Sequence, residues 1–91
     1  MRKVTEKVVG AFNQKQAKSN GNTSTDGQSL FLHGNKIAEW REDGLYVTNA
    51  GWATNVTKER LNAVQGVSVR QKDFTWYLNG LVWDGSWNKV A

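Results

Sequence analysis

Apolar residues near the N-terminus recur at the spacing of one helical face. They are Val4, Val8, Ala11 and Phe12, at positions i, i+4, i+7 and i+8. This spacing is typical of an amphipathic helix and predicts one from Val4 to about Ala17. Gly10 in its middle costs about 1 kcal/mol relative to alanine, so we expect a sheet to hold this helix in place.

The next eleven residues, Ser19–Ser29, contain no aliphatic side chain and consist mainly of Asn, Gly, Ser and Thr. Such a composition between patterned segments is typical of a loop. The sequence therefore predicts a mobile polar loop over residues 19–29.

A period of two then replaces the helical pattern, and short turn sequences divide the chain. Gly34-Asn35 separates Leu30–His33 from Lys36–Trp40, and Arg41–Gly44 separates that segment from Leu45–Asn49. These segments predict a three-stranded antiparallel meander.

The turn lengths also predict the register of this meander. A two-residue turn at Gly34-Asn35 places Phe31 opposite Ala38. A four-residue loop at Arg41–Gly44 places Trp40 opposite Leu45 and Ala38 opposite Val47. One apolar face then consists of Phe31, Ala38, Trp40, Leu45 and Val47. The other contains Leu30, Leu32, Ile37 and Tyr46. A sheet with two apolar faces needs two covers, and the second is a helix or another protein.

A second helix is predicted from a cap at Thr54 or Asn55 to about Gln65, with Glu59 in its first turn and Gly66 as its left-handed stop. The segments that follow predict strands: Val67–Gln71, Phe74–Leu78, Leu81–Trp83 and Trp87–Val90. Lys72-Asp73 and Asn79-Gly80 join the first three, and Asn-Gly is a strong hairpin signal. The fold class is therefore α+β: an N-terminal helix, a three-stranded antiparallel meander, a second helix and a C-terminal antiparallel hairpin or meander.

At 91 residues the chain is short enough for one domain. We assign residues 1–18 to a basic helix, 19–29 to the polar loop and 30–91 to an α+β core. Phe74, Trp76 and Leu78 share one strand face, and we expect them in the core.

Composition argues against several classes of chemistry. The chain has no Cys and a single His, which excludes disulfides and Cys-based metal sites. His33 lies beside a predicted turn, and all four aspartates lie in turn sequences, where Asp acts first as a turn former. No glycine-rich phosphate loop is present. We therefore expect no enzyme activity, no catalytic residue, no cofactor and no metal.

The formal net charge of +4 resides entirely in residues 1–18. Its basic residues are Arg2, Lys3, Lys7, Lys15 and Lys18. This basic arm either solvates the outer face of a helix or follows a phosphate backbone or an acidic protein surface.

Exposed aromatic and basic residues are the candidates for contacts with a partner. Tyr77 lies on the strand face opposite Trp76, Arg70 lies in the preceding strand and Lys72 lies in the turn between them. Basic residues interleaved with aromatic ones on a sheet are also used to bind single-stranded nucleic acid. Trp52 lies in the segment between the meander and the second helix, where it fills a gap or contacts a partner, and Tyr46 lies on the second apolar face of the meander. Because Trp and Tyr are enriched at binding hot spots, these five residues form our candidate partner-binding set.

The N-terminal segment MRKVTEKVVGAF lacks the apolar run of a signal peptide, and no window approaches a membrane span. We expect a cytoplasmic protein that contacts no membrane.

The stretch Asp26–Val64 and the ending Trp76–Trp87 resemble small uncharacterised proteins of tailed bacteriophages. The resemblance rests on the patterns T-D-G-x-S-L, T-N-x-T-x-x-R-L-N and W-Y-L-N-G-x-x-W-D-G-x-W. It implies a phage origin and expression in the cytoplasm of an infected bacterium, but it carries over no functional residue. By analogy with other phage accessory proteins, it implies binding to a host factor.

Our leading hypothesis is a non-enzymatic phage accessory protein that inhibits or modulates a host or phage macromolecule, above all a host defence or gene-expression protein. The alternative is a nucleic-acid-binding module that uses the basic arm and the Arg70–Tyr77 strand. The sequence leaves the oligomeric state, including a homo-oligomer, open.

Overall fold

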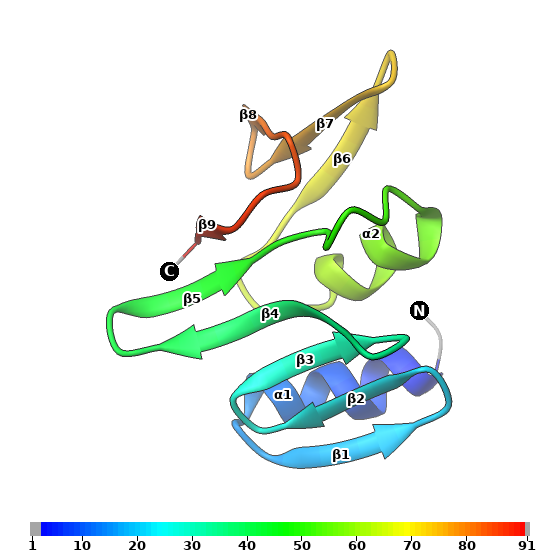
Figure 1. Ribbon diagram of the computed structural model, residues 1–91, viewed down its shortest axis with the longest axis vertical. Coiled ribbons are helices and arrows are strands. Elements are labelled where there is room, and N and C mark those ends of the chain that lie inside the picture. Colours follow the sequence, from blue (N-terminus) through cyan, green and yellow to red (C-terminus); the bar gives the residue numbers. More distant parts are fainter. Residues whose placement is uncertain (1–2, 91) are drawn as a thin grey trace.

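The computed structural model describes residues 3–90 and shows an α+β fold built from two antiparallel sheets and short helices (Figure 1). The larger sheet has the order β1-β2-β3-β4-β5-β9, and the smaller one has the order β6-β7-β8. The strands are β1 Ala17–Asn20, β2 Thr23–Asp26, β3 Ser29–Leu32, β4 Asn35–Arg41, β5 Gly44–Val47, β6 Val69–Lys72, β7 Thr75–Leu78, β8 Leu81–Val82 and β9 Asn88–Lys89.

The predicted N-terminal helix is confirmed, but it is shorter than expected. It consists of the π-helical turn η1 (Thr5–Val9) followed by α1 (Gly10–Asn13). Val8, Val9 and Phe12 are fully buried against the larger sheet, and Figure 1 shows this helix behind β1–β3. The helix ends before Ala17 because Lys15 takes a left-handed conformation (φ 59°) that turns the chain into β1.

The prediction of a mobile loop over Ser19–Ser29 is wrong, because this segment forms the β1–β2 hairpin and the start of β3. Thr23 and Thr25 are both buried on the helix side of the sheet, whereas Ser24 between them is half-buried and Asp26 is exposed. The Asp26 carboxylate accepts hydrogen bonds from the backbone N–H groups of Gln28 (2.9 Å) and Ser29 (2.7 Å), which closes the β2–β3 turn. The larger sheet therefore begins with a five-stranded meander rather than a three-stranded one.

Arg60 explains how such a polar hairpin packs against the core. Its side chain is only 1% exposed, and its guanidinium donates to the hydroxyl groups of Thr23 (2.9 Å) and Thr5 (2.7 Å). Glu59 pairs with the same guanidinium and accepts a hydrogen bond from Thr5. One buried cation thus connects the first helix, the β1–β2 hairpin and the second helix, and it gives the hydroxyl groups of Thr5 and Thr23 a hydrogen-bond partner.

The predicted register is confirmed between β4 and β5 and is wrong between β3 and β4. Trp40 lies opposite Leu45 and Ala38 opposite Val47, as expected. Phe31, however, lies opposite Lys36, and Leu30 lies opposite Ala38, because the turn is at His33-Gly34 and an irregularity follows at Leu30/Phe31. The face beneath the first helix therefore carries Leu30 rather than Phe31.

The second helix, α2 (Asn55–Asn62), begins where the sequence predicted. The Thr54 hydroxyl accepts a hydrogen bond from the Thr57 backbone N–H (3.2 Å) and caps the helix. The helix ends earlier than Gln65, Glu59 lies beyond the first turn, and Gly66 has the expected positive φ (84°).

The smaller sheet projects from the body of the molecule in Figure 1. Trp76 and Leu78 are buried, as predicted, and the Trp76 and Trp83 rings pack at 6.1 Å. The assignment of Phe74 to the core is wrong, because its side chain is 96% exposed. The physical reason is that the β6–β7 turn lies at Asp73-Phe74 and not at Lys72-Asp73, so Phe74 is at the tip of the hairpin.

Within residues 3–90, no helix is long and apolar enough to cross a membrane.

Candidate functional site

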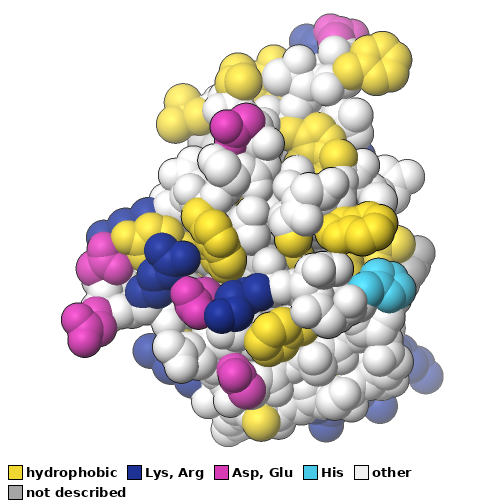
Figure 2. All heavy atoms as spheres, viewed as in Figure 1, with side chains coloured by type: hydrophobic (Ala, Val, Ile, Leu, Met, Phe, Trp, Pro, Cys, Tyr) yellow, Lys and Arg dark blue, Asp and Glu magenta, His cyan; other side chains and the backbone are white. Residues whose placement is uncertain are grey.

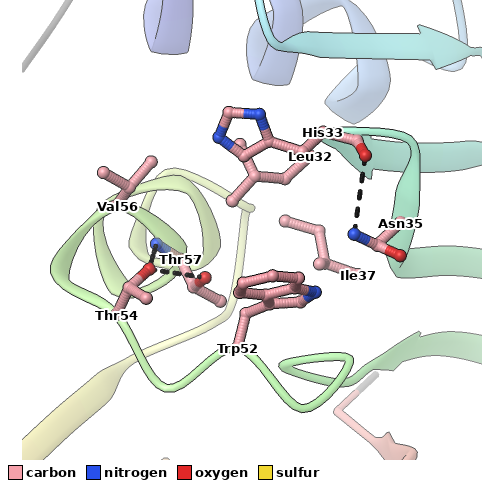
Figure 3. Close-up of a pocket in the computed structure, with 8 residues that line it drawn as sticks. All are labelled: Leu32, His33, Asn35, Ile37, Trp52, Thr54, Val56 and Thr57. Carbon is pink, nitrogen blue, oxygen red and sulfur yellow. Dashed lines mark hydrogen bonds between the residues drawn. The ribbon is translucent and has the colours of Figure 1, made fainter.

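A pocket of about 230 Å³ opens where the β3–β4 turn approaches the start of α2. Its lining residues are Leu32, His33, Asn35, Ile37, Trp52, Thr54, Val56 and Thr57. Figure 3 shows the rings of His33 and Trp52 on opposite sides of the pocket, with Leu32 and Ile37 between them. The pocket therefore has an apolar floor and an aromatic wall.

The β3–β4 hairpin forms one half of this pocket. His33 (φ 51°) and Gly34 (φ 78°) make the tight turn, and the His33 backbone N–H donates to the carbonyl of Asn22 (2.7 Å). The pairing of β3 with β4 shifts register between Leu30 and Phe31. The neighbouring residues Ile37 and Ala38 are both buried, with exposed fractions of 1% and 0%. A regular strand would send neighbouring side chains to opposite faces, so the irregularity brings Ile37 into the pocket floor.

The loop between β5 and α2 forms the other half and holds Trp52. The Trp52 backbone N–H donates to the Asn49 carbonyl (2.8 Å), and the Gly51 N–H donates to the Asn49 side chain (2.9 Å). Asn49 is itself fixed, because its N–H donates to the carbonyl of Gly85 (3.0 Å). Ala50 has a positive φ of 55°, which is uncommon for a residue other than glycine. The loop thus holds Trp52 in a defined position although the side chain is 56% exposed.

The size of the pocket limits what it can hold. Small-molecule and cofactor sites usually occupy about 300–1,000 Å³ and enclose most of the ligand. At about 230 Å³ the pocket is smaller than that range. It suits one large side chain of a partner better than a cofactor. Within residues 3–90, no cluster of three or more His, Cys, Asp or Glu side chains could hold a metal ion.

Tyr46, another predicted contact residue, does not line the pocket. Its hydroxyl donates to Asp43 (2.7 Å), which lowers the pKa of the Asp43 carboxyl and raises the pKa of Tyr46 above its ordinary value. The Arg41 guanidinium lies over the Tyr46 ring (4.2 Å) and over the Trp87 ring (4.9 Å). Through these contacts Tyr46 helps to hold the β4–β5 hairpin against the C-terminal segment.

Arg70, Lys72 and Tyr77 lie together in the smaller sheet, away from the pocket residues. Arg70 lies directly opposite Tyr77, and Lys72, two residues along β6, shares their face. Arg70 and Lys72 are exposed, Tyr77 is half-buried, and no ion pair engages either cation within the described part of the chain. The sequence predicted Arg70 in a strand and Lys72 in the turn after it, whereas the structure has Lys72 as the last residue of β6, on the same face as Arg70 and Tyr77.

The basic arm is not a single helical face. Lys3 and Lys7 belong to the helical segment, Lys18 lies on β1, and Lys15 lies at the turn between them, over the Trp40 ring at 4.7 Å. Arg2 lies outside the described residues. The four described lysines are exposed. On the face shown in Figure 2, Lys and Arg side chains are interspersed with acidic ones. Outside the basic arm, Lys36 and Arg41 both form ion pairs with Glu39.

Trp52, a candidate from the sequence, lines the pocket, but the other lining residues and the exposed position of Phe74 were not predicted. The pocket joins segments about twenty residues apart, and nothing in either segment alone marks the other. No local signal marked the exposed position of Phe74, because a two-residue turn one position later places an aromatic residue where Gly is preferred.

Comparison with known proteins identifies one family. The chain matches the model of the family described as Kyanoviridae Gp96 protein over residues 1–90. No curated protein and no solved structure matches it significantly.

Proposed function

The chain belongs to the Kyanoviridae Gp96 protein family, a family of cyanophage proteins, and from that premise we propose that it is a non-enzymatic accessory protein that binds another protein in the infected cell. The partner is a host or phage protein, above all one of host defence or gene expression, and binding inhibits or modulates it. The protein acts in the cytoplasm of the infected host.

The observation that carries this proposal is the exposed Trp52 held at the edge of an apolar pocket. Trp is among the residues most enriched at binding hot spots, where an anchor side chain fills a pocket on the partner surface. Trp52 is more than half exposed, so its side chain buries little apolar area and contributes little to the stability of the fold. A positive φ at Ala50 beside it adds a further cost to the folded state. Binding a partner accounts for both costs.

The proposal commits the pocket to one large apolar or aromatic side chain of the partner. Leu32, Ile37 and Val56 supply apolar contact, and Trp52 supplies a flat ring. Such an anchor would be desolvated on all sides, which is the environment in which hot-spot residues contribute most to affinity.

The experiment compares two variants of the full chain as baits in nuclease-treated lysate of infected cyanobacteria. Trp52→Ala removes the pocket wall, and Phe74→Ala removes an exposed aromatic residue that is not part of the pocket. We expect a partner that wild type and Phe74→Ala capture equally and that Trp52→Ala loses. Equal capture by all three baits, with circular dichroism showing that each is folded, would refute the pocket as the binding site.

The second candidate function is nucleic-acid binding, and one observation favours it: Arg70, Lys72 and Tyr77 share a face on which no described acid pairs with the cations. The basic arm supports it less, because its lysines are distributed over three segments. Binding of this kind would weaken steeply with salt, because each phosphate contact releases counterions.

A further inference from the structure

The tip of the β6–β7 hairpin carries two features that folding does not require. Phe74 is 96% exposed, the highest value among the large hydrophobic side chains of residues 3–90. It also has a positive φ of 67°, following Asp73 at 51°. A bulky residue in this conformation is an outlier, because its Cβ crowds the backbone.

Two other hairpins of the same molecule show what the turn would ordinarily contain. The β3–β4 turn is His33-Gly34 and the β7–β8 turn is Asn79-Gly80, and in both the second residue is a glycine with positive φ. Two-residue turns of this kind favour glycine at that position. The β6–β7 turn instead has Phe74 there, at the tip of a hairpin that projects from the body in Figure 1.

Cations accompany the exposed ring. Arg70 and Lys72 lie on one face of β6, with no ion pair among the described residues, and they are separated by about 6.8 Å along the strand. Phosphates recur at regular intervals along each strand of nucleic acid, so two cations held on one strand face can bind phosphates of the same backbone. Tyr77 completes this face opposite Arg70.

We propose that the β6–β7 hairpin is a nucleic-acid-binding ribbon in which Phe74 inserts against the bases while Arg70 and Lys72 bind phosphates. Apolar side chains, Phe among them, are inserted between base steps by proteins that kink DNA, and aromatic rings stack on the bases of single strands. Nucleic acid supplies apolar base surfaces and regularly spaced anions together, which accounts for the exposed ring and the unpaired cations with one ligand.

This surface is separate from the Trp52 pocket and does not depend on the proposed protein partner. A bound nucleic acid and a bound protein would occupy different sheets of the molecule. Asp73 opposes phosphate binding, so its conversion to Asn, which is also favoured in such turns, should tighten the complex.

The test measures binding of the full chain to a short duplex DNA, and to one of its strands alone, each containing the fluorescent base 2-aminopurine. Titrations at about 50 and 200 mM salt give the affinity and its salt slope. Insertion of Phe74 unstacks the reporter base, so its fluorescence rises in the duplex arm. In the single-strand titration, stacking of Phe74 on an unpaired base also changes the fluorescence of the reporter. The oligonucleotide with the higher affinity identifies the form of nucleic acid that is bound.

Two variants separate the ring from the charges. Phe74→Gly should weaken binding by roughly 5- to 150-fold, the equivalent of one lost stacking contact, and abolish the fluorescence change without altering the salt slope. Arg70→Gln with Lys72→Gln should flatten the slope by about 1.8 on duplex, or about 1.4 on a single strand. Trp52→Ala should bind like wild type.

Three results would overturn the proposal. They are no binding to either oligonucleotide at about 50 mM salt, unchanged affinity of Phe74→Gly, and self-association of the free protein that Phe74→Gly abolishes. The last result would show that Phe74 contacts a second copy of the chain. Because Trp52 is not involved, each of them leaves the pocket proposal standing.

Discussion

Replacing Phe74 by Gly should make the protein more stable, although it deletes an aromatic side chain. The ring is 96% exposed, so its removal loses almost no buried area. The backbone at this position has a φ of 67°, where a residue other than Gly pays about 1–2 kcal/mol. Gly loses about 0.5–1 kcal/mol more conformational freedom on folding, which offsets part of that gain.

The net expectation is a gain of about 0.5–1 kcal/mol in the free energy of unfolding, or a rise of roughly 2–8 °C in Tm for a domain of this size. Urea and thermal unfolding followed by fluorescence of the buried Trp76 and Trp83 would measure it. Destabilisation by more than about 0.5 kcal/mol would refute the reasoning, because it would mean that the Phe74 ring packs against the fold.

Gly80 provides the matched control. It occupies the equivalent position of the β7–β8 turn with a φ of 87°, and a Cβ there would meet no other atom within 4 Å. Gly80→Ala therefore tests the backbone conformation without a steric clash, and it should destabilise by about 1 kcal/mol. Opposite signs at these two positions would show that turn conformation governs both.

Three further predictions concern the core and the pH dependence. Trp76→Ala should cost about 3–5 kcal/mol in urea unfolding, because Trp76 is buried against Trp83. Arg60→Ala should cost a similar amount, about 3–5 kcal/mol, in the same assay, because it removes a fully buried cation from its partners. Hydrogen bonds from the Ser29 and Gln28 backbone N–H groups lower the pKa of Asp26 below 3.8, so its charged form stabilises the fold above that pH. Stability of wild type relative to Asp26→Asn should therefore fall as the pH drops below 3.8 through the folded-state pKa, as unfolding at several pH values would show.

Local patterns predicted those elements whose own residues determine them. The period-two segments gave β3, β4 and β5, and the Thr54 cap and Gly66 marked the region of the second helix. The strand face on which each side chain lies depended on the exact two residues that form each turn. A shift of one residue at His33-Gly34, and another at Asp73-Phe74, moved side chains to a different face or to a hairpin tip.

Long-range partners explain what the sequence could not predict. The segment 19–29 resembled a loop because its buried residues are threonines, and their hydroxyl groups need a partner before burial is favourable. For Thr23 that partner is Arg60, which lies 37 residues away and looked like an exposed residue of the second helix. The pocket depends in the same way on two distant segments, so Trp52 was a candidate without a visible site.

Photo-crosslinking from the pocket tests the central claim most directly. A benzophenone amino acid in place of Trp52 keeps an aromatic ring at the pocket, and the same group in place of the exposed Glu42, in the β4–β5 turn, serves as the control. After irradiation in infected cyanobacteria, we expect one protein to be crosslinked from position 52 and not from position 42, in nuclease-treated samples. Identical crosslinking patterns from both positions, or no crosslinked protein from position 52, would contradict a partner bound at this pocket.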